Sequence, residues 1–206
     1  MILKLIVLSL YFSILLGIGY FASRRVTNIT DYYVGGKKLG YWIAALSARS
    51  TGESGWLLIG VTGMGALMGF SAFWIVVGEV LGVWISWQFM AKKFKRMTDE
   101  YNSITIPDFL VSHFKSTTHL IRIVSATALS LFVVIYVSAQ IDITGKTFES
   151  FLGFNYYTGI TIGFGIVVLY IFSGGFLAVA WSDFFQGSLM FIGLLLLPVV
   201  AYFSLS

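Results

Sequence analysis

Long apolar runs separated by short polar stretches dominate the sequence. Each run is long enough, at about 1.5 Å of rise per residue, to cross about 30 Å of hydrocarbon as a helix. The pattern predicts six membrane spans, over residues 5–22, 41–69, 73–91, 121–143, 157–180 and 184–204. The second and third spans leave only Gly69 to Ala72 for a tight hairpin. We therefore expect an all-α integral membrane protein.

The first apolar run has one competing interpretation, a cleaved secretory signal. Lys4 precedes the run, as in a signal peptide, but the run from Leu5 to Ala22 is long for a signal core. Arg24 and Arg25 follow it directly, which is the pattern of a stop-transfer segment. We expect a retained span.

Composition supports the membrane class and limits the chemistry. Hydrophobic residues make up 58% of the chain and charged residues 11%, against about 25% charged in soluble domains. The absence of cysteine excludes disulfides and thiolate metal sites.

The charge distribution predicts the orientation of the spans. The net charge of +4 comes mainly from Lys and Arg in residues 23–40 and 92–122. These two stretches lie on one side of the membrane if the spans alternate, and that side should be cytoplasmic. The N-terminus is then outside, in a multi-pass protein of the cell (inner) membrane, and the basic excess does not indicate nucleic-acid binding.

The second cytoplasmic stretch contains a predicted short interfacial helix at residues 106–114. Pro107 suits a first helical turn, and Phe109, Leu110 and Phe114 are expected to lie on lipid. The histidines at 113 and 119 are expected to be solvated loop residues, so no metal site is predicted there.

The second span holds an unusual polar stretch, Ser47-Ala48-Arg49-Ser50-Thr51-Gly52-Glu53-Ser54-Gly55. Charges at membrane depth cost about 3 kcal/mol or more unless they face protein or water. Unwound backbone there is tolerated only in protein or beside a cavity, where its carbonyls suit a small cation. A broken helix with an ion and solute site is the favoured interpretation. The alternatives are a cytoplasmic hairpin between two shorter spans, and an intact helix with Arg49 paired to Glu53.

Other spans also carry isolated polar residues. Glu79 is functional by default or the structural partner of a neighbouring Arg or hydroxyl. Tyr136 and Gln140 share a helix face, and either hydrogen-bond between helices or contact solute. Asp183 is either a functional carboxylate or a cap at the start of the sixth span. Gly174 and Gly175 indicate close helix packing or a sharp bend.

Catalytic motifs are missing from the sequence. It contains no HExxH, P-loop, Rossmann or nucleophile-elbow pattern, so we do not expect an enzyme.

Four segments, in order, resemble the sodium/solute symporter family, and most closely its sodium/proline symporter branch. They are Tyr33–Gly40, Ala45–Leu58, Tyr101–Asp108 and Gly174–Gln186, the last with its Gly-Gly and Trp-Ser-Asp. The resemblance implies an inverted-repeat (LeuT-type) fold. Residues 5–22 would be an accessory helix and residues 41–206 the first five-helix repeat, within a single transmembrane domain covering 1–206. The second repeat is expected beyond Ser206, in a longer protein.

The resemblance also implies roles for individual residues. Sodium would be held by the backbone carbonyls of Ser50 and Glu53, and Asp183 would line its exit route. Solute would lie near Gly52, Ser54, Gly55 and Trp56, with contributions from Tyr136 and Gln140. Glu79 weakly matches a substrate carboxylate of sugar-carrying relatives. No cofactor other than the coupling sodium ion is implied.

Two departures from the proline branch qualify the expected solute. That branch has an aspartate where this chain has Gly52, and Arg49 is unusual so close to a cation site. The expected function is sodium-coupled symport of proline by alternating access. The alternatives are a symporter for another amino acid, an organic acid or a sugar, a membrane sensor module, and a structural subunit. The expected partners are the solute, sodium, the lipid bilayer and the second repeat.

Overall fold

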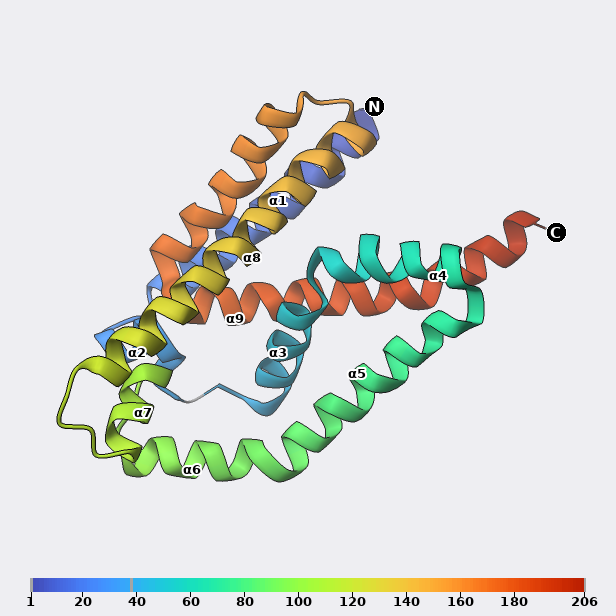
Figure 1. Ribbon diagram of the computed structural model, residues 1–206. Coiled ribbons are helices and arrows are strands. Elements are labelled where there is room, and N and C mark those ends of the chain that lie inside the picture. The colour runs from blue at the N-terminus through green and yellow to red at the C-terminus, as the bar shows by residue number, and fades with distance from the viewer. Residues whose placement is uncertain (1, 38, 206) are drawn as a thin grey trace. The chain divides into compact units, whose positions relative to one another are not determined.

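The computed structural model describes residues 2–37 and 39–205, without the side chains of Trp56, Leu58, Ile59 and Leu205. Every regular element in these ranges is a helix (Figure 1). The α-helices are α1 (Ile2–Ser23), α2 (Ile29–Val34), α3 (Tyr41–Gly55), α4 (Thr62–Met68), α5 (Phe73–Ile85), α6 (Lys92–Glu100), α7 (Ile106–His113), α8 (Leu120–Leu152) and α9 (Tyr156–Leu205). Tighter 3₁₀ turns cover Gly35–Lys37 and Gly69–Ala72, and wider π-helical turns cover Trp56–Val61 and Ser86–Ala91.

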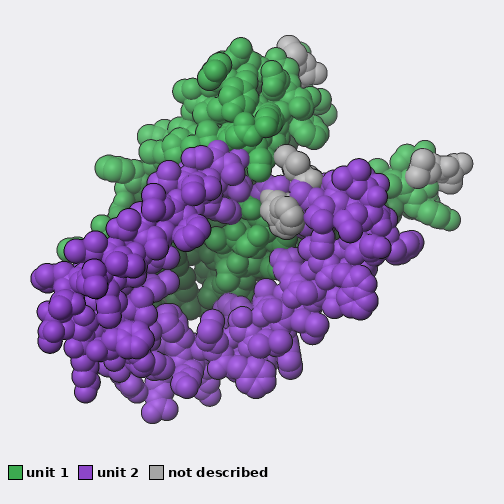
Figure 2. All heavy atoms as spheres, viewed as in Figure 1, with its two compact units in different colours: residues 1–54, 141–206 green, residues 55–140 purple. Residues whose placement is uncertain are grey.

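The chain divides into two compact units, coloured separately in Figure 2. Unit 1 comprises residues 1–54 and 141–206, and unit 2 comprises residues 55–140. Helix α3 ends one residue inside unit 2, and α8 begins in unit 2 and ends in unit 1.

The core of unit 1 lies between α1 and α9. Leu15, Ala22, Tyr170 and Ala178 are buried there. Small residues allow the two helices to approach closely, since a Cβ added to Gly174 would lie 3.0 Å from the Cβ of Ala22. This is the packing expected of helices in a bilayer, where close backbone contact replaces the hydrophobic drive.

Helix α9 contains the sharp bend that the Gly174-Gly175 pair predicted. Gly175 has φ 55° and ψ −147°, and a Cβ there would lie 2.5 Å from the carbonyl oxygen of Tyr32. The break between the two predicted spans lies at this bend and not at residues 181–183, which are helical. The buried hydroxyl of Ser182 is satisfied within this helix, since it donates to the carbonyl of Ala178 at 2.8 Å.

Helix α8 is longer than the predicted fourth span at 121–143. Its last turns pack on α9 through glycines, and a Cβ on Gly163 would lie 2.6 Å from Cγ2 of Thr144. Asp142 ties the same region together, accepting from Lys146 Nζ at 2.6 Å and from the Tyr156 hydroxyl at 2.8 Å. These bonds let charged residues continue the helix where the sequence pattern indicated its end.

Unit 2 contains the predicted hairpin and the predicted short helix. The hairpin turns at Gly69, which has φ 57°. Helix α7 begins after Thr105, whose hydroxyl accepts from the backbone N–H of Asp108 at 3.2 Å. Phe109 does not face lipid as predicted, because it is buried with its ring 4.9 Å from that of Phe94.

Four described helical segments are long and apolar enough to cross a membrane: Ile2–Ser23, Thr62–Glu100, Leu120–Leu152 and Tyr156–Ser204. The second contains the turn at Gly69–Ala72, and the fourth contains the bend at Gly175. Large apolar side chains are widely exposed on them, such as Phe70 and Phe172. The molecule is a multi-pass membrane protein.

Candidate functional site

Helix α3 is broken near its end, as the polar stretch predicted. Ser54 has φ 20° and ψ −162°, far from helical values, and a π-helical turn follows at Trp56–Val61. Gly52, Ser54 and Gly55 favour this break because glycine stabilises helices poorly and serine offers the backbone other partners. The intact helix is therefore wrong. Residues 47–53 are helical, and the alternative of a cytoplasmic hairpin between two shorter spans stays a prediction.

On the N-terminal side of the break, within unit 1, hydroxyl groups join α3 to α9. The Ser47 hydroxyl donates to Oδ2 of Asp183 at 2.6 Å, and the Ser50 hydroxyl donates to the Asp183 carbonyl at 3.0 Å. A Cβ on Gly187 would collide with the Ser50 hydroxyl. Close packing at Gly187 therefore holds this polar strip against α9.

Asp183 is a bridging residue and does not cap a helix. It lies inside α9, half-buried, so the predicted capping role at the start of a span is wrong. Its carboxylate faces Ser47, which the sequence interpretation had not assigned to the site. The available signal was the spacing of Ser47, Ser50 and Thr51, which places three hydroxyls on one helix face.

The predicted pair of Arg49 and Glu53 is present. The guanidinium contacts Oε1 of Glu53, and the two side chains are 44% and 7% exposed respectively. The other carboxylate oxygen, Oε2, is buried and has no hydrogen-bond partner among the described residues. The pair thus places one charge at the protein surface and the other inside.

Directly after the break, within unit 2, the backbone of Gly55 forms a hydrogen bond with the side chain of Gln140. The Gly55 N–H donates to Oε1 of Gln140 at 3.2 Å, whereas in a regular helix it would bond the carbonyl four residues earlier. Of the two roles predicted for Gln140, hydrogen bonding between segments is present.

The remaining predicted site residues occupy varied environments. Gly52 has open space around it, because an added Cβ would meet no atom within 4 Å. Glu79 is half-buried on α5, and Tyr136 is 44% exposed on α8, one turn before Gln140. The side chain of Trp56 lies outside the described residues.

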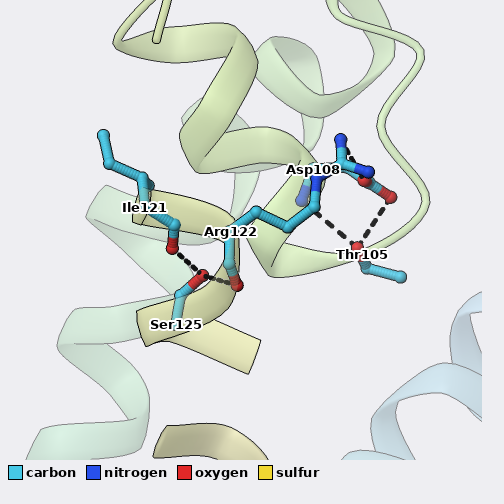
Figure 3. A network of polar contacts seen from close by, with 5 residues as sticks. All are labelled: Thr105, Asp108, Ile121, Arg122 and Ser125. Carbon is cyan, nitrogen blue, oxygen red and sulfur yellow. Dashed lines mark hydrogen bonds and ion pairs between the residues drawn. The ribbon is translucent and has the colours of Figure 1, made fainter. Parts of the chain in front are cut away.

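A second polar network lies in the loop region of unit 2 and is structural (Figure 3). Arg122 of α8 pairs with Oδ1 of Asp108 at 3.1 Å, while Thr105 donates to Oδ2 at 2.7 Å. The hydroxyl of Ser125 donates a hydrogen bond to the carbonyl of Ile121 in its own helix. The network fixes the start of α7 against α8.

The site offers oxygen ligands and dipoles without a nucleophile or a metal cluster. Hydroxyls, carboxylates and an interrupted backbone are the groups that membrane proteins use for small cations and polar solutes. No group of three or more His, Cys, Asp or Glu side chains in the described ranges is placed to hold a metal ion.

Comparison with known proteins gives a consistent result. A model of the sodium:solute symporter family matches residues 32–206. The high-affinity proline transporter PutP of Bacillus subtilis (strain 168) is 46% identical over 187 residues, or 90% of this chain and 40% of that protein. The sodium/proline symporter of Escherichia coli (strain K12) is 41% identical over 189 residues, or 91% of this chain and 38% of that protein.

A third relative, the osmoregulated proline transporter OpuE of Bacillus subtilis (strain 168), is 39% identical over 96% of this chain and 40% of its own length. The chain thus spans about 40% of the length of the curated relatives it matches. No solved structure matches it significantly. These relatives are transporters and not enzymes, and the match over residues 32–206 shows that the chain belongs to the sodium:solute symporter family.

Proposed function

We propose that this chain supplies the first five-helix repeat, and a preceding accessory helix, of a sodium-coupled proline symporter. The break in α3 at Ser54 is the observation that carries the proposal. We place this interrupted helix end within the membrane, where such ends coordinate the coupling ion in transporters of the inverted-repeat type. The names of the relatives, two of them sodium/proline symporters or proline transporters at above 40% identity, support this solute.

Sodium is proposed to bind at the end of the first half of α3, through the backbone carbonyls of Ser50 and Glu53. The C-terminal end of a helix carries a partial negative charge, which favours a cation there. Asp183 is proposed to line the sodium exit route. Its hydrogen bonds with Ser47 and Ser50 support this role, because they place a carboxylate beside the same half-helix.

Proline is proposed to bind beyond the break, near Gly52, Ser54, Gly55 and Trp56, with Glu79, Tyr136 and Gln140 as further contacts. The bond from Gly55 to Gln140 supports the assignment of Gln140, since it ties that side chain to the interrupted backbone. The open space at Gly52 supports a solute-facing position there. The helical stretch after the break, Trp56–Val61 continuing into α4, begins with a positive dipole end, which suits the carboxylate of an amino acid.

Uptake of labelled proline by the full-length protein in proteoliposomes tests the proposal. We expect accumulation only with an inward sodium gradient, and competition by unlabelled proline above other amino acids, organic acids and sugars. Uptake that ignores the sodium gradient, or that another solute class suppresses better than proline, contradicts the proposal.

The proposed topology has six crossings and an N-terminus outside the cell. The 206 residues contain no cysteine, so a single introduced thiol reports its side of the membrane without background from them. We expect Lys146→Cys to react with an impermeant maleimide from outside, and Lys93→Cys only after the membrane is opened. The reverse labelling would invert the orientation.

A further inference from the structure

Glu53 carries a buried charge whose compensation is incomplete within the described residues. Its side chain is 7% exposed, and only Oε1 contacts the guanidinium of Arg49. Oε2 is inaccessible and has no hydrogen-bond partner in the part of the chain that the structure describes. A buried ion normally satisfies all of its lone pairs, because the desolvation penalty is several kcal/mol per ion even in relaxed proteins.

The geometry of the pair explains why Arg49 cannot serve both oxygens. The arginine side chain is 44% exposed, so it approaches the carboxylate from the outer surface of the helix. Oε2 is on the protected side. Arg49 therefore pairs with one oxygen of the carboxylate, while Oε2 stays a buried acceptor without a partner among the described residues.

The position of Glu53 provides a second, independent attraction for a cation. Ser54, the next residue, has the non-helical φ of 20° that ends this half of α3. Carbonyl dipoles at the end of a helix favour positive charge within the last turn. The unpartnered carboxylate oxygen and the helix end thus coincide within one residue of the chain.

We propose that Oε2 of Glu53 binds the coupling sodium ion directly. The inference rests on the proposed function and adds a charged side-chain ligand to a site otherwise formed by backbone carbonyls. Arg49 is then a positioning residue, which holds Oε1 and leaves Oε2 available. It also weakens sodium binding, because its charge opposes the cation.

The opposing roles of Arg49 and Glu53 distinguish this inference from a structural ion pair. In the full-length protein, Glu53→Gln should raise the half-saturating sodium concentration at least tenfold, with a maximal rate within threefold of the original. Arg49→Met should lower that concentration, and the double variant should resemble Glu53→Gln. A structural pair predicts that both single variants weaken function and that the double variant recovers.

The experiment measures ²²Na⁺ binding to purified full-length protein without solute, beside sodium-dependent proline uptake. Glu149→Gln is the matched control, since it removes an exposed carboxylate and should leave sodium binding unchanged. If Glu53→Gln does not reach the membrane, Arg49→Met decides alone, and unchanged or weaker sodium binding overturns the inference.

The two readouts separate the inference from the proposed function. If sodium binding depends on Glu53 but no proline is taken up, the sodium site is supported and the proposal of proline as the solute is contradicted. Sodium-driven proline uptake with unchanged sodium affinity in Glu53→Gln would keep the function and overturn the role of Glu53.

Discussion

The hydroxyl of Ser47 donates a 2.6 Å hydrogen bond to the carboxylate of Asp183, a residue 136 positions later in the chain. Together with the bond from Ser50 to the Asp183 backbone, it joins the first half of α3 to α9. Movement of α3 relative to α9 must therefore break a charge-assisted hydrogen bond. The contribution of this bond to the free energy of unfolding can be measured.

Ser47→Ala should lower the free energy of unfolding by about 1.5–3 kcal/mol, because the lost hydrogen bond has a charged acceptor. The measurement is a denaturation titration of the full-length protein in mixed micelles. In an Asp183→Leu background the same substitution should cost much less, because the acceptor is already gone. Ser188→Ala is the control, since its hydroxyl bonds only the carbonyl of Phe184 in its own helix. Equal losses in both backgrounds would show that the two side chains are not coupled.

Gly175→Ala should destabilise the protein by more than about 1–3 kcal/mol, the usual cost of a strained backbone residue. A side chain there meets both the φ of 55° and the carbonyl oxygen of Tyr32 at 2.5 Å. The melting temperature of the full-length protein in detergent reports the loss. Gly165→Ala is matched, because a Cβ there meets nothing within 4 Å. A melting temperature equal to that of Gly165→Ala would contradict the bend.

Gln140→Leu should leave the backbone N–H of Gly55 without its acceptor. The donor is partly buried, so its loss should disturb the broken segment by about 1 kcal/mol, and roughly tenfold in affinity corresponds to about 1.4 kcal/mol. We expect the KM for proline to rise about tenfold in the uptake assay. Gln88→Leu, at an exposed position of the π-helical turn Ser86–Ala91, should change it little. Equal KM values for the two variants would remove Gln140 from the site.

The stability of α7 should depend on Phe109 much more than on Arg122. Phe109 is buried against Phe94 and Tyr101, so Phe109→Ala should cost about 3 kcal/mol or more. Arg122→Gln removes an ion pair that is half exposed on the arginine side, which is worth about 1 kcal/mol or less. Hydrogen exchange of the α7 amides should be fast in the first variant and nearly unchanged in the second. If exchange of the α7 amides is accelerated equally in both variants, the ion pair contributes more to the stability of α7 than we expect.

Local sequence patterns were sufficient where one stretch decides its own conformation. The break at Ser54 followed from consecutive weak helix formers, the bend from Gly174-Gly175, and the hairpin from the few residues between two apolar runs. The start of α7 followed from Pro107 in the same way.

Patterns failed where a distant partner decides the outcome. Asp183 resembled a helix cap because nothing in its neighbourhood indicates Ser47, far earlier in the chain. Helix α8 runs past the predicted span at 121–143, and Asp142 is compensated there by Lys146 and Tyr156. Phe109 was assigned to lipid because its aromatic neighbours come from other segments. The family resemblance supplied roles for residues, but it could not supply these contacts.

The pairing of Arg49 with Glu53 also has an electrical consequence. The two side chains carry opposite formal charges, so the pair as a whole adds no net charge beside a sodium ion, even where Oε2 of Glu53 is a ligand. In the proposed symporter, a sodium ion travelling with a zwitterionic amino acid would then move one positive charge across the bilayer. The membrane potential contributes about 2.3 kcal/mol per 100 mV to such a movement. Accumulation of solute would therefore be driven by the membrane potential as well as by the sodium gradient, and each transport cycle would produce a measurable current.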